Sequence, residues 1–69
     1  MKGVIYYMVA KKVEIYWDID PVAGLLWFYD VFVQGQDVEE DEPFISGFSF
    51  SASEALTKCL NEMREKGVR

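Results

Sequence analysis

The sequence predicts a single α+β domain, in which an antiparallel meander of three or four strands carries one C-terminal helix on one face. Three observations lead to this fold class. Apolar residues alternate with a period of two over the first part of the chain, turn-forming residues interrupt the apolar segments, and a capped amphipathic pattern ends the chain. Five Phe, four Tyr and two Trp in 69 residues also favour strands. A chain of this length has room for one domain, residues 1–69.

The first strand segment covers about residues 4–19. Odd positions from Ile5 to Ile19 are apolar, and Lys11 is the one exception. Lys11 and Lys12 lack the tolerance of positive φ that a tight hairpin turn requires. We therefore expect a bend or a bulge there, and the pattern leaves open whether the segment forms one strand or two.

Two further strands are predicted at about residues 25–34 and 43–50. Asp20, Pro21 and Gly24 form a turn, so the second strand pairs antiparallel with the first. Gly35 and an acidic run form the next loop. Gly47 inside the third strand indicates a bulge or a close packing contact. Three rings of this strand are expected on one side: Phe44, Phe48 and Phe50.

A helix is predicted over residues 51–66. Ser51 and Glu54 match a capping box, and Gly67 is placed as a C-terminal stop. Apolar residues recur at helical spacing and form one stripe: Ala52, Ala55, Leu56, Cys59, Leu60 and Met63.

The sheet face opposite the helix is too apolar for a face that meets water. Such a face of an antiparallel sheet normally alternates to polar residues, and a large apolar patch marks an interface. We therefore expect a homodimer or a constant protein partner, bound through this face or through an edge strand. The candidate interface residues are Tyr6, Met8, Tyr16, Leu26, Phe28 and Phe32.

All of the net charge of −5 lies in one short segment. This segment is a candidate binding site for a basic protein partner, and it argues against direct binding of nucleic acid. A solvated loop and a cation site are the alternatives, although the spacing lacks the pattern of an EF-hand. The five acidic residues are Asp37, Glu39, Glu40, Asp41 and Glu42.

Catalytic chemistry has little support in the residue types. The chain has no histidine, and its single cysteine, Cys59, falls on the apolar stripe of the helix, where we expect a buried, inert thiol. Asp18, Asp20 and Asp30 are the one candidate for metal-assisted catalysis, with solvated strand-end acids as the alternative. We expect no cofactor and no enzymatic activity.

Uncharged stretches such as residues 21–29 are far shorter than a membrane-spanning helix. The start of the chain lacks the apolar region of a secretory signal, and one cysteine cannot form an internal disulfide. We expect a cytoplasmic protein without membrane contact.

The segment from Tyr29 to Leu60 resembles the strand, strand and helix layout of HicB-type antitoxins. The matching positions are Pro43, Gly47, Glu54, Ala55 and Leu56. The resemblance covers under half of the chain, and no family is assigned from it. It implies an antitoxin or regulatory partner that binds through its aromatic sheet face.

The leading functional hypothesis is a non-catalytic protein-interaction module. One version is an acidic decoy, encoded by a mobile element, that inhibits a nucleic-acid-handling protein by presenting carboxylates to a phosphate-binding groove. The HicB-like partner and a small metal-assisted enzyme remain as alternatives.

Overall fold

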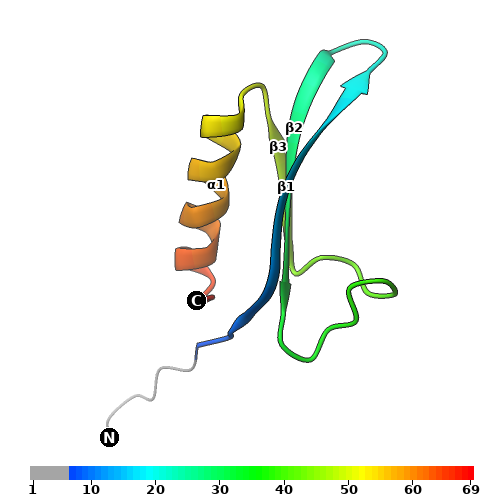
Figure 1. The fold of residues 1–69 in the computed structure, drawn as a ribbon. Coiled ribbons are helices and arrows are strands. Elements are labelled where there is room, and N and C mark those ends of the chain that lie inside the picture. Colours follow the sequence, from blue (N-terminus) through cyan, green and yellow to red (C-terminus); the bar gives the residue numbers. More distant parts are fainter. Residues whose placement is uncertain (1–6) are drawn as a thin grey trace, which may run out of the picture.

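The computed structural model describes residues 7–69 and has two layers, a sheet and one helix (Figure 1). The strands are β1 (Ala10–Asp20), β2 (Gly24–Val33) and β3 (Ile45–Ser49), and the helix is α1 (Ala52–Glu65). The sheet is antiparallel with the order β1-β2-β3, and α1 packs on one of its faces. The predicted α+β meander with a C-terminal helix is confirmed.

β1 is one continuous strand with an irregularity where the sequence predicts one. Ala10 pairs with Val33 and Lys12 pairs with Phe32, so Lys11 is an extra residue in β1. Such a bulge reverses the side to which the preceding residues point. Met8 therefore packs against the core on the helix side. Its predicted place beside Tyr16 on the opposite face is wrong.

A side-chain cap shapes the turn between β1 and β2. The Asp20 carboxylate accepts hydrogen bonds from the backbone N–H groups of Val22 and Ala23, both at 2.8 Å. These bonds hold the pKa of Asp20 below its usual value. Gly24 follows with φ of 86°, a conformation that glycine adopts without strain.

Gly47 is the point of closest packing within the sheet. It pairs with Tyr29, and a Cβ atom at position 47 would overlap the Tyr29 ring and hydroxyl. Tyr29 is only 1% exposed, so the ring has no space into which it can retreat. The second of the two explanations for Gly47, a close contact, is the one that the structure shows.

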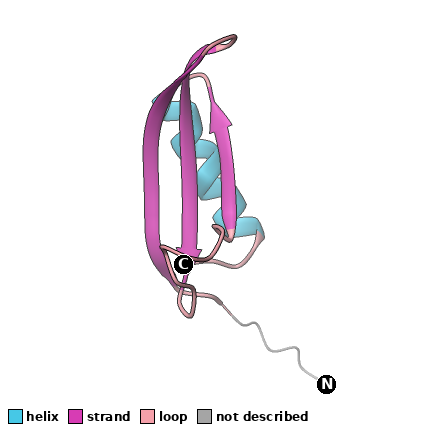
Figure 2. Cartoon of the chain, turned by 90° about the vertical axis from the view of Figure 1, so that its right-hand side faces the viewer, coloured by secondary structure: helices cyan, strands magenta, loops and turns pink. Residues whose placement is uncertain are grey.

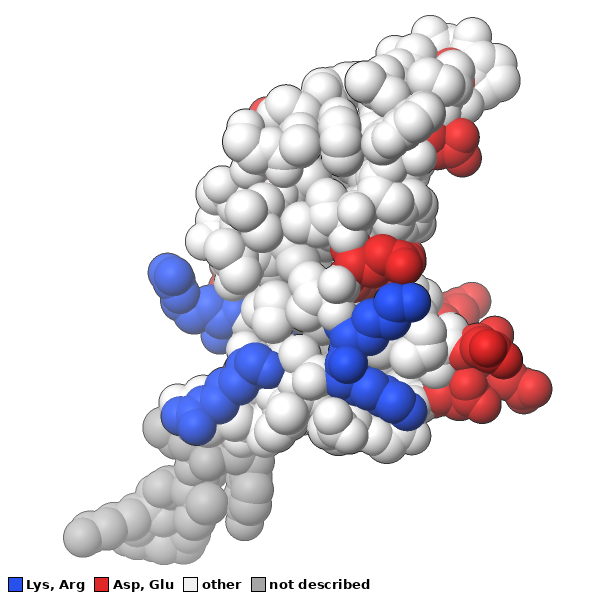
Figure 3. All heavy atoms as spheres, in the orientation of Figure 1, with Lys and Arg blue, Asp and Glu red and all other residues white. Residues whose placement is uncertain are grey.

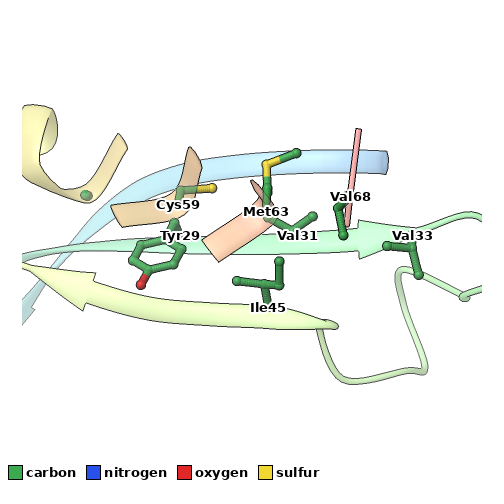
Figure 4. Packing of buried hydrophobic residues seen from close by; sticks show 8 residues of the cluster. Tyr29, Val31, Val33, Ile45, Cys59, Met63 and Val68 are labelled. Carbon is green, nitrogen blue, oxygen red and sulfur yellow. The ribbon is translucent and has the colours of Figure 1, made fainter. Parts of the chain in front are cut away.

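The helix begins as predicted. Ser51 is the N-cap and its hydroxyl accepts a hydrogen bond from the Glu54 N–H at 3.2 Å. Ala55, Cys59 and Met63 face the sheet, whereas Leu56 and Leu60 are about half exposed. The predicted apolar stripe is therefore wider than the surface that the sheet covers. The core cluster lies between α1 and β2–β3 (Figure 4) and consists of Tyr29, Val31, Val33, Ile45, Ala55, Cys59, Met63 and Val68.

The residues after the helix form a short parallel pairing that the sequence did not predict. Val68 bridges to Met8, and Met8 and Ala10 donate hydrogen bonds to the carbonyls of Gly67 and Arg69 at 2.9 and 2.7 Å. The start of the described chain is thereby fixed beside its end. Within residues 7–69, no helix has the length and apolar character that crossing a membrane requires.

Candidate protein-interaction surface

A row of aromatic rings lies across the sheet face that α1 leaves uncovered. Tyr16 pairs with Phe28 across β1 and β2, and Phe28 pairs with Phe48 across β2 and β3. The ring centroids are 5.5 Å apart in the first pair and 6.2 Å in the second, and Phe50 meets Phe48 edge-on at 6.4 Å. Tyr16, Phe28, Phe48 and Phe50 are called the aromatic ladder below.

The aromatic ladder is accessible to a partner. Tyr16, Phe48 and Phe50 are 39%, 49% and 69% exposed. Tyr16 and Phe48 lie on strands, and Phe50 directly follows the end of β3. The Tyr16 hydroxyl is held by a 3.0 Å hydrogen bond to the Asp30 carboxylate. Burial and this hydrogen bond raise the pKa of Tyr16, so its hydroxyl stays protonated at neutral pH. The face combines exposed apolar area with a donor and acceptor at one end.

Only part of the predicted interface lies on this ladder. Tyr16 and Phe28 belong to it, whereas Leu26 and Phe32 are each only 6% exposed and already packed within the chain. Met8 lies on the helix side, as described above, and Tyr6 lies outside the described residues. Two of the predicted interface residues, Leu26 and Phe32, therefore offer a partner almost no accessible surface, and the interface itself stays a prediction.

Phe48 and Phe50 are the ladder residues absent from the predicted interface. The grouping of Phe44 with them is wrong, because Phe44 packs against the core. Phe44 lies just before β3, and its N–H already bonds to the Val31 carbonyl at 2.9 Å. Phe48 is directly paired with Phe28 on the same face of the sheet. The alternation of side chains along β3, aligned with that along β2, was the sequence signal that could have assigned Phe48 to this face.

The acidic residues lie on a loop held by its own hydrogen bonds. Gln36 bridges the loop, since its side chain accepts from the Val33 N–H at 3.0 Å and donates to the Glu42 carbonyl at 2.9 Å. The Asp37 and Asp41 carboxylates accept from the N–H groups of Glu39 and Asp37 at 2.9 and 2.8 Å. All five acidic side chains are exposed, namely Asp37, Glu39, Glu40, Asp41 and Glu42; they are called the acidic loop below.

The acidic loop projects on the open side of the sheet. In Figure 1 the chain after β2 leaves on the side opposite α1. In Figure 3 Asp and Glu gather at the right, over this loop, whereas the Lys and Arg side chains lie to the left of it. The acidic loop is therefore one concentrated region of negative charge. Elsewhere opposite charges meet, as in the ion pair of Lys12 with Glu14 on β1 at 3.2 Å.

The three aspartates of the metal-assisted alternative are each used locally. Asp18 accepts from the Ile19 N–H at 2.7 Å, Asp20 caps the turn, and Asp30 accepts from the Tyr16 hydroxyl. Across residues 7–69, no three acidic or cysteine side chains form a group that could hold a metal ion. The part of the chain that the structure describes thus offers no assembled cation site.

Cys59 is buried against the sheet, as the sequence predicts. Burial raises the pKa of its thiol, and the nearby Glu62 carboxylate raises it further. A raised pKa reduces the thiolate fraction that a nucleophile needs. This cysteine has the environment of a packing residue.

A second exposed apolar area lies at the tip of the β1–β2 hairpin, on the helix side. Trp17 and Trp27 are directly paired there, and with Leu25 they line an apolar hollow of about 330 Å³. Trp17 and Ile19 are both more than half exposed. The hairpin extends past the first turn of α1 (Figure 1), so the helix leaves these side chains uncovered.

Comparisons of the chain with protein-family models, with curated proteins and with solved structures found no match. The function is therefore inferred from the surface of the chain itself.

Proposed function

We propose that this chain is a non-catalytic protein-interaction module that binds a partner protein through the aromatic ladder. The observation that carries the proposal is the continuous contact of four rings on an uncovered sheet face, three of them well exposed. Aromatic residues are enriched in protein interfaces, where they supply large contact area at a small cost in conformational entropy.

The ladder suits a partner because its rings are positioned before binding. Tyr16 and Phe28 are stacked with an interplanar angle of 18°. Phe48 follows Gly47 on β3, and Gly47 is packed closely against Tyr29. Little side-chain freedom is then lost on association. A partner that presents a flat apolar surface would cover these rings without rearranging the sheet.

The acidic loop gives the proposal its electrostatic part. The loop lies on the same side of the sheet as the ladder, and its carboxylates point to solvent. A basic partner would be attracted to this side and oriented with the apolar contact at the ladder. The more specific version, an acidic decoy that inhibits a nucleic-acid-handling protein, differs in giving the five carboxylates the dominant role.

The experiment compares three variants with the natural chain in binding to proteins of the native host. The ladder variant carries Phe48→Ser and Phe50→Ser. The loop variant carries the amide at all five acidic positions. The matched control carries Leu56→Ser and Leu60→Ser, because these apolar side chains are also about half exposed but lie on α1, away from the ladder.

A specific partner is expected to be lost with the ladder variant and kept by the helix control, with modest dependence on ionic strength. A partner that is lost with the loop variant and with rising salt, but kept by the ladder variant, would support the decoy version instead. A partner that all variants retain would contradict both. Each variant is first checked for an unchanged far-ultraviolet circular dichroism spectrum.

A further inference from the structure

The two edge strands of the sheet, β3 and β1, differ in how far their outer backbone groups are covered. On β3, the Lys58 ammonium reaches from α1 and donates to the Phe48 carbonyl at 2.8 Å. A short strand with a lysine on its edge is protected against pairing with another strand. At the other edge, within residues 7–69, the residues after α1 bond only to Met8, just before β1, and to Ala10, at its start. Among the described residues, β1 from Lys11 to Asp20 pairs with β2 alone (Figure 2).

The direction of the backbone groups on β1 follows from two hydrogen bonds. The Val31 carbonyl accepts from Phe44 N–H and so points toward β3, whereas Gln34 N–H donates to Val9 and points toward β1. Backbone groups alternate between the two sides of a strand. Even residues of β2 therefore bond to β1, and the residues of β1 opposite them are Lys12, Glu14, Tyr16 and Asp18. The outer edge of β1 presents the N–H and C=O groups of Val13, Ile15 and Trp17. It also presents the C=O group of Ile19, whose N–H already donates to the Asp18 carboxylate at 2.7 Å.

We propose that this edge binds the β1 edge of a second copy of the chain, antiparallel and centred on Ile15. The two-fold axis then passes between Ile15 and Ile15 of the second copy, near the middle of the free segment. Val13 forms a hydrogen-bonded pair with Trp17 of the second copy, and Trp17 forms the same pair with Val13 of the second copy. Each hydrogen-bonded pair exchanges two N–H···O bonds, which gives about six across the interface.

Charge complementarity favours this register over the two adjacent ones, centred on Glu14 and on Tyr16. Centring on Ile15 places Lys12 opposite Asp18 of the second copy, and Glu14 opposite Tyr16, all on the open face. These are non-hydrogen-bonded pairs, in which side chains come closest. Centring on Tyr16 would oppose Glu14 with Asp18, and centring on Glu14 would oppose two Glu14 side chains, both like-charge pairs that destabilise a sheet.

The helix side of the same edge is apolar and partly exposed. Val13 and Trp17 are exposed by 45% and 59%, and Ile15 is partly buried against the core. The proposed register sets Val13 against Trp17 of the second copy and Ile15 against its equivalent. Exposed apolar side chains that the α1 helix leaves uncovered are thereby buried on both copies.

The resulting dimer is one continuous antiparallel sheet of six strands. Because the two-fold axis is perpendicular to the sheet, both helices lie on one side and both aromatic ladders on the other. The pairing places Glu14 beside Tyr16 at one end of the ladder but leaves Phe28, Phe48 and Phe50 uncovered, so it goes beyond the proposed function and does not depend on it. A partner of the ladder would meet two equivalent sites, which raises avidity without new contacts.

Sedimentation equilibrium of the natural chain up to high-micromolar concentration tests the proposal. Twice the chain mass is expected. Lys12→Glu and Asp18→Lys should each raise the dimer Kd at least about tenfold, because two opposite-charge pairs become like-charge pairs. The double variant Lys12→Glu with Asp18→Lys should restore the dimer. An equimolar mixture of the two single variants should form a heterodimer, since each then opposes unlike charges.

Val13→Pro tests the backbone part of the same interface. Position 13 turns its N–H to the outer edge, so proline removes an intermolecular donor without breaking the β1–β2 ladder. This variant should be a folded monomer, and Val13→Thr, which keeps the N–H, should remain a dimer. A natural chain that is monomeric at all concentrations would overturn the proposal. So would a dimer that tolerates both single charge reversals, or one that the double variant fails to restore.

Discussion

The two faces of β2 differ although their residues alternate along one strand. On the helix side, Tyr29, Val31 and Val33 are buried under α1. On the open side, Phe28 contacts rings of β1 and β3, and Asp30 is the next β2 residue on that face. One face is closed by a second layer, whereas the other is covered only by contacts among its own side chains.

This difference separates residues that hold the fold from residues that are available for binding. A closed face loses packing and creates a cavity when a side chain is truncated. A half-exposed ring loses less, because solvent already reaches it. Substitutions on the two faces should therefore have unequal effects on the free energy of unfolding, and this inequality can be measured.

The largest effect is expected from truncation on the closed face. Ile45→Ala should lower the free energy of unfolding by about 3 kcal/mol, because Ile45 is only 2% exposed and faces α1. Phe48→Ala, on the same strand but the open face, should cost about 1 kcal/mol or less. Urea unfolding followed by fluorescence measures both. Equal losses would show that the open face is as essential to folding as the closed one.

Gly47→Ala should cost about 2 kcal/mol, because the new Cβ would overlap the Tyr29 ring and force both strands to shift. The matched control is Ser46→Ala, the adjacent exposed position, which should change the free energy of unfolding by less than about 0.5 kcal/mol. The midpoint of urea unfolding reports the difference. A Gly47→Ala variant as stable as the control would mean that Tyr29 does not pack over the strand.

Ser49→Ala should raise the free energy of unfolding by about 1 kcal/mol. Ser49 is 2% exposed and its hydroxyl has no hydrogen-bond partner among the described residues. Removing a buried polar atom without a partner removes its desolvation cost. For a domain of this size the melting temperature should rise by roughly 4–8 °C. A fall in melting temperature would indicate that the hydroxyl is bonded in solution.

The smallest effect is expected from alkaline pH. Burial raises the pKa of Tyr29 above its unfolded value of about 10, and the Glu62 carboxylate raises it further. The folded state thus binds the phenolic proton more tightly, so this contribution to stability is complete below pH of about 10 and is lost as pH rises through the folded pKa. Comparing melting temperatures of the natural chain and Tyr29→Phe from pH 8 upward measures it. A variant that declines as steeply as the natural chain would rule out Tyr29 as the source.

The sequence by itself determined the local elements. Alternation predicted the strands, Ser51 and Glu54 predicted the start of the helix, and the lysine pair predicted the irregularity in β1. These signals depend on residues within a few positions of each other, and local backbone preference is sufficient to express them. The acidic loop could be predicted for the same reason, because its acidic residues lie close together in the sequence.

Only the tertiary structure decided which apolar residues stay exposed. Leu26 and Phe32 resemble Phe28 in the sequence, yet they are buried, whereas Leu56 and Leu60 remain outside the core that the predicted helix stripe includes. The bulge at Lys11 moved Met8 to the other face, and the pairing of Val68 with Met8 joined segments far apart in the chain. The burial of a side chain depends on which elements pack against it. On the helix side of the sheet, one helix is narrower than three strands and covers only part of them. Periodicity identifies a face but does not measure how much of it a neighbour covers.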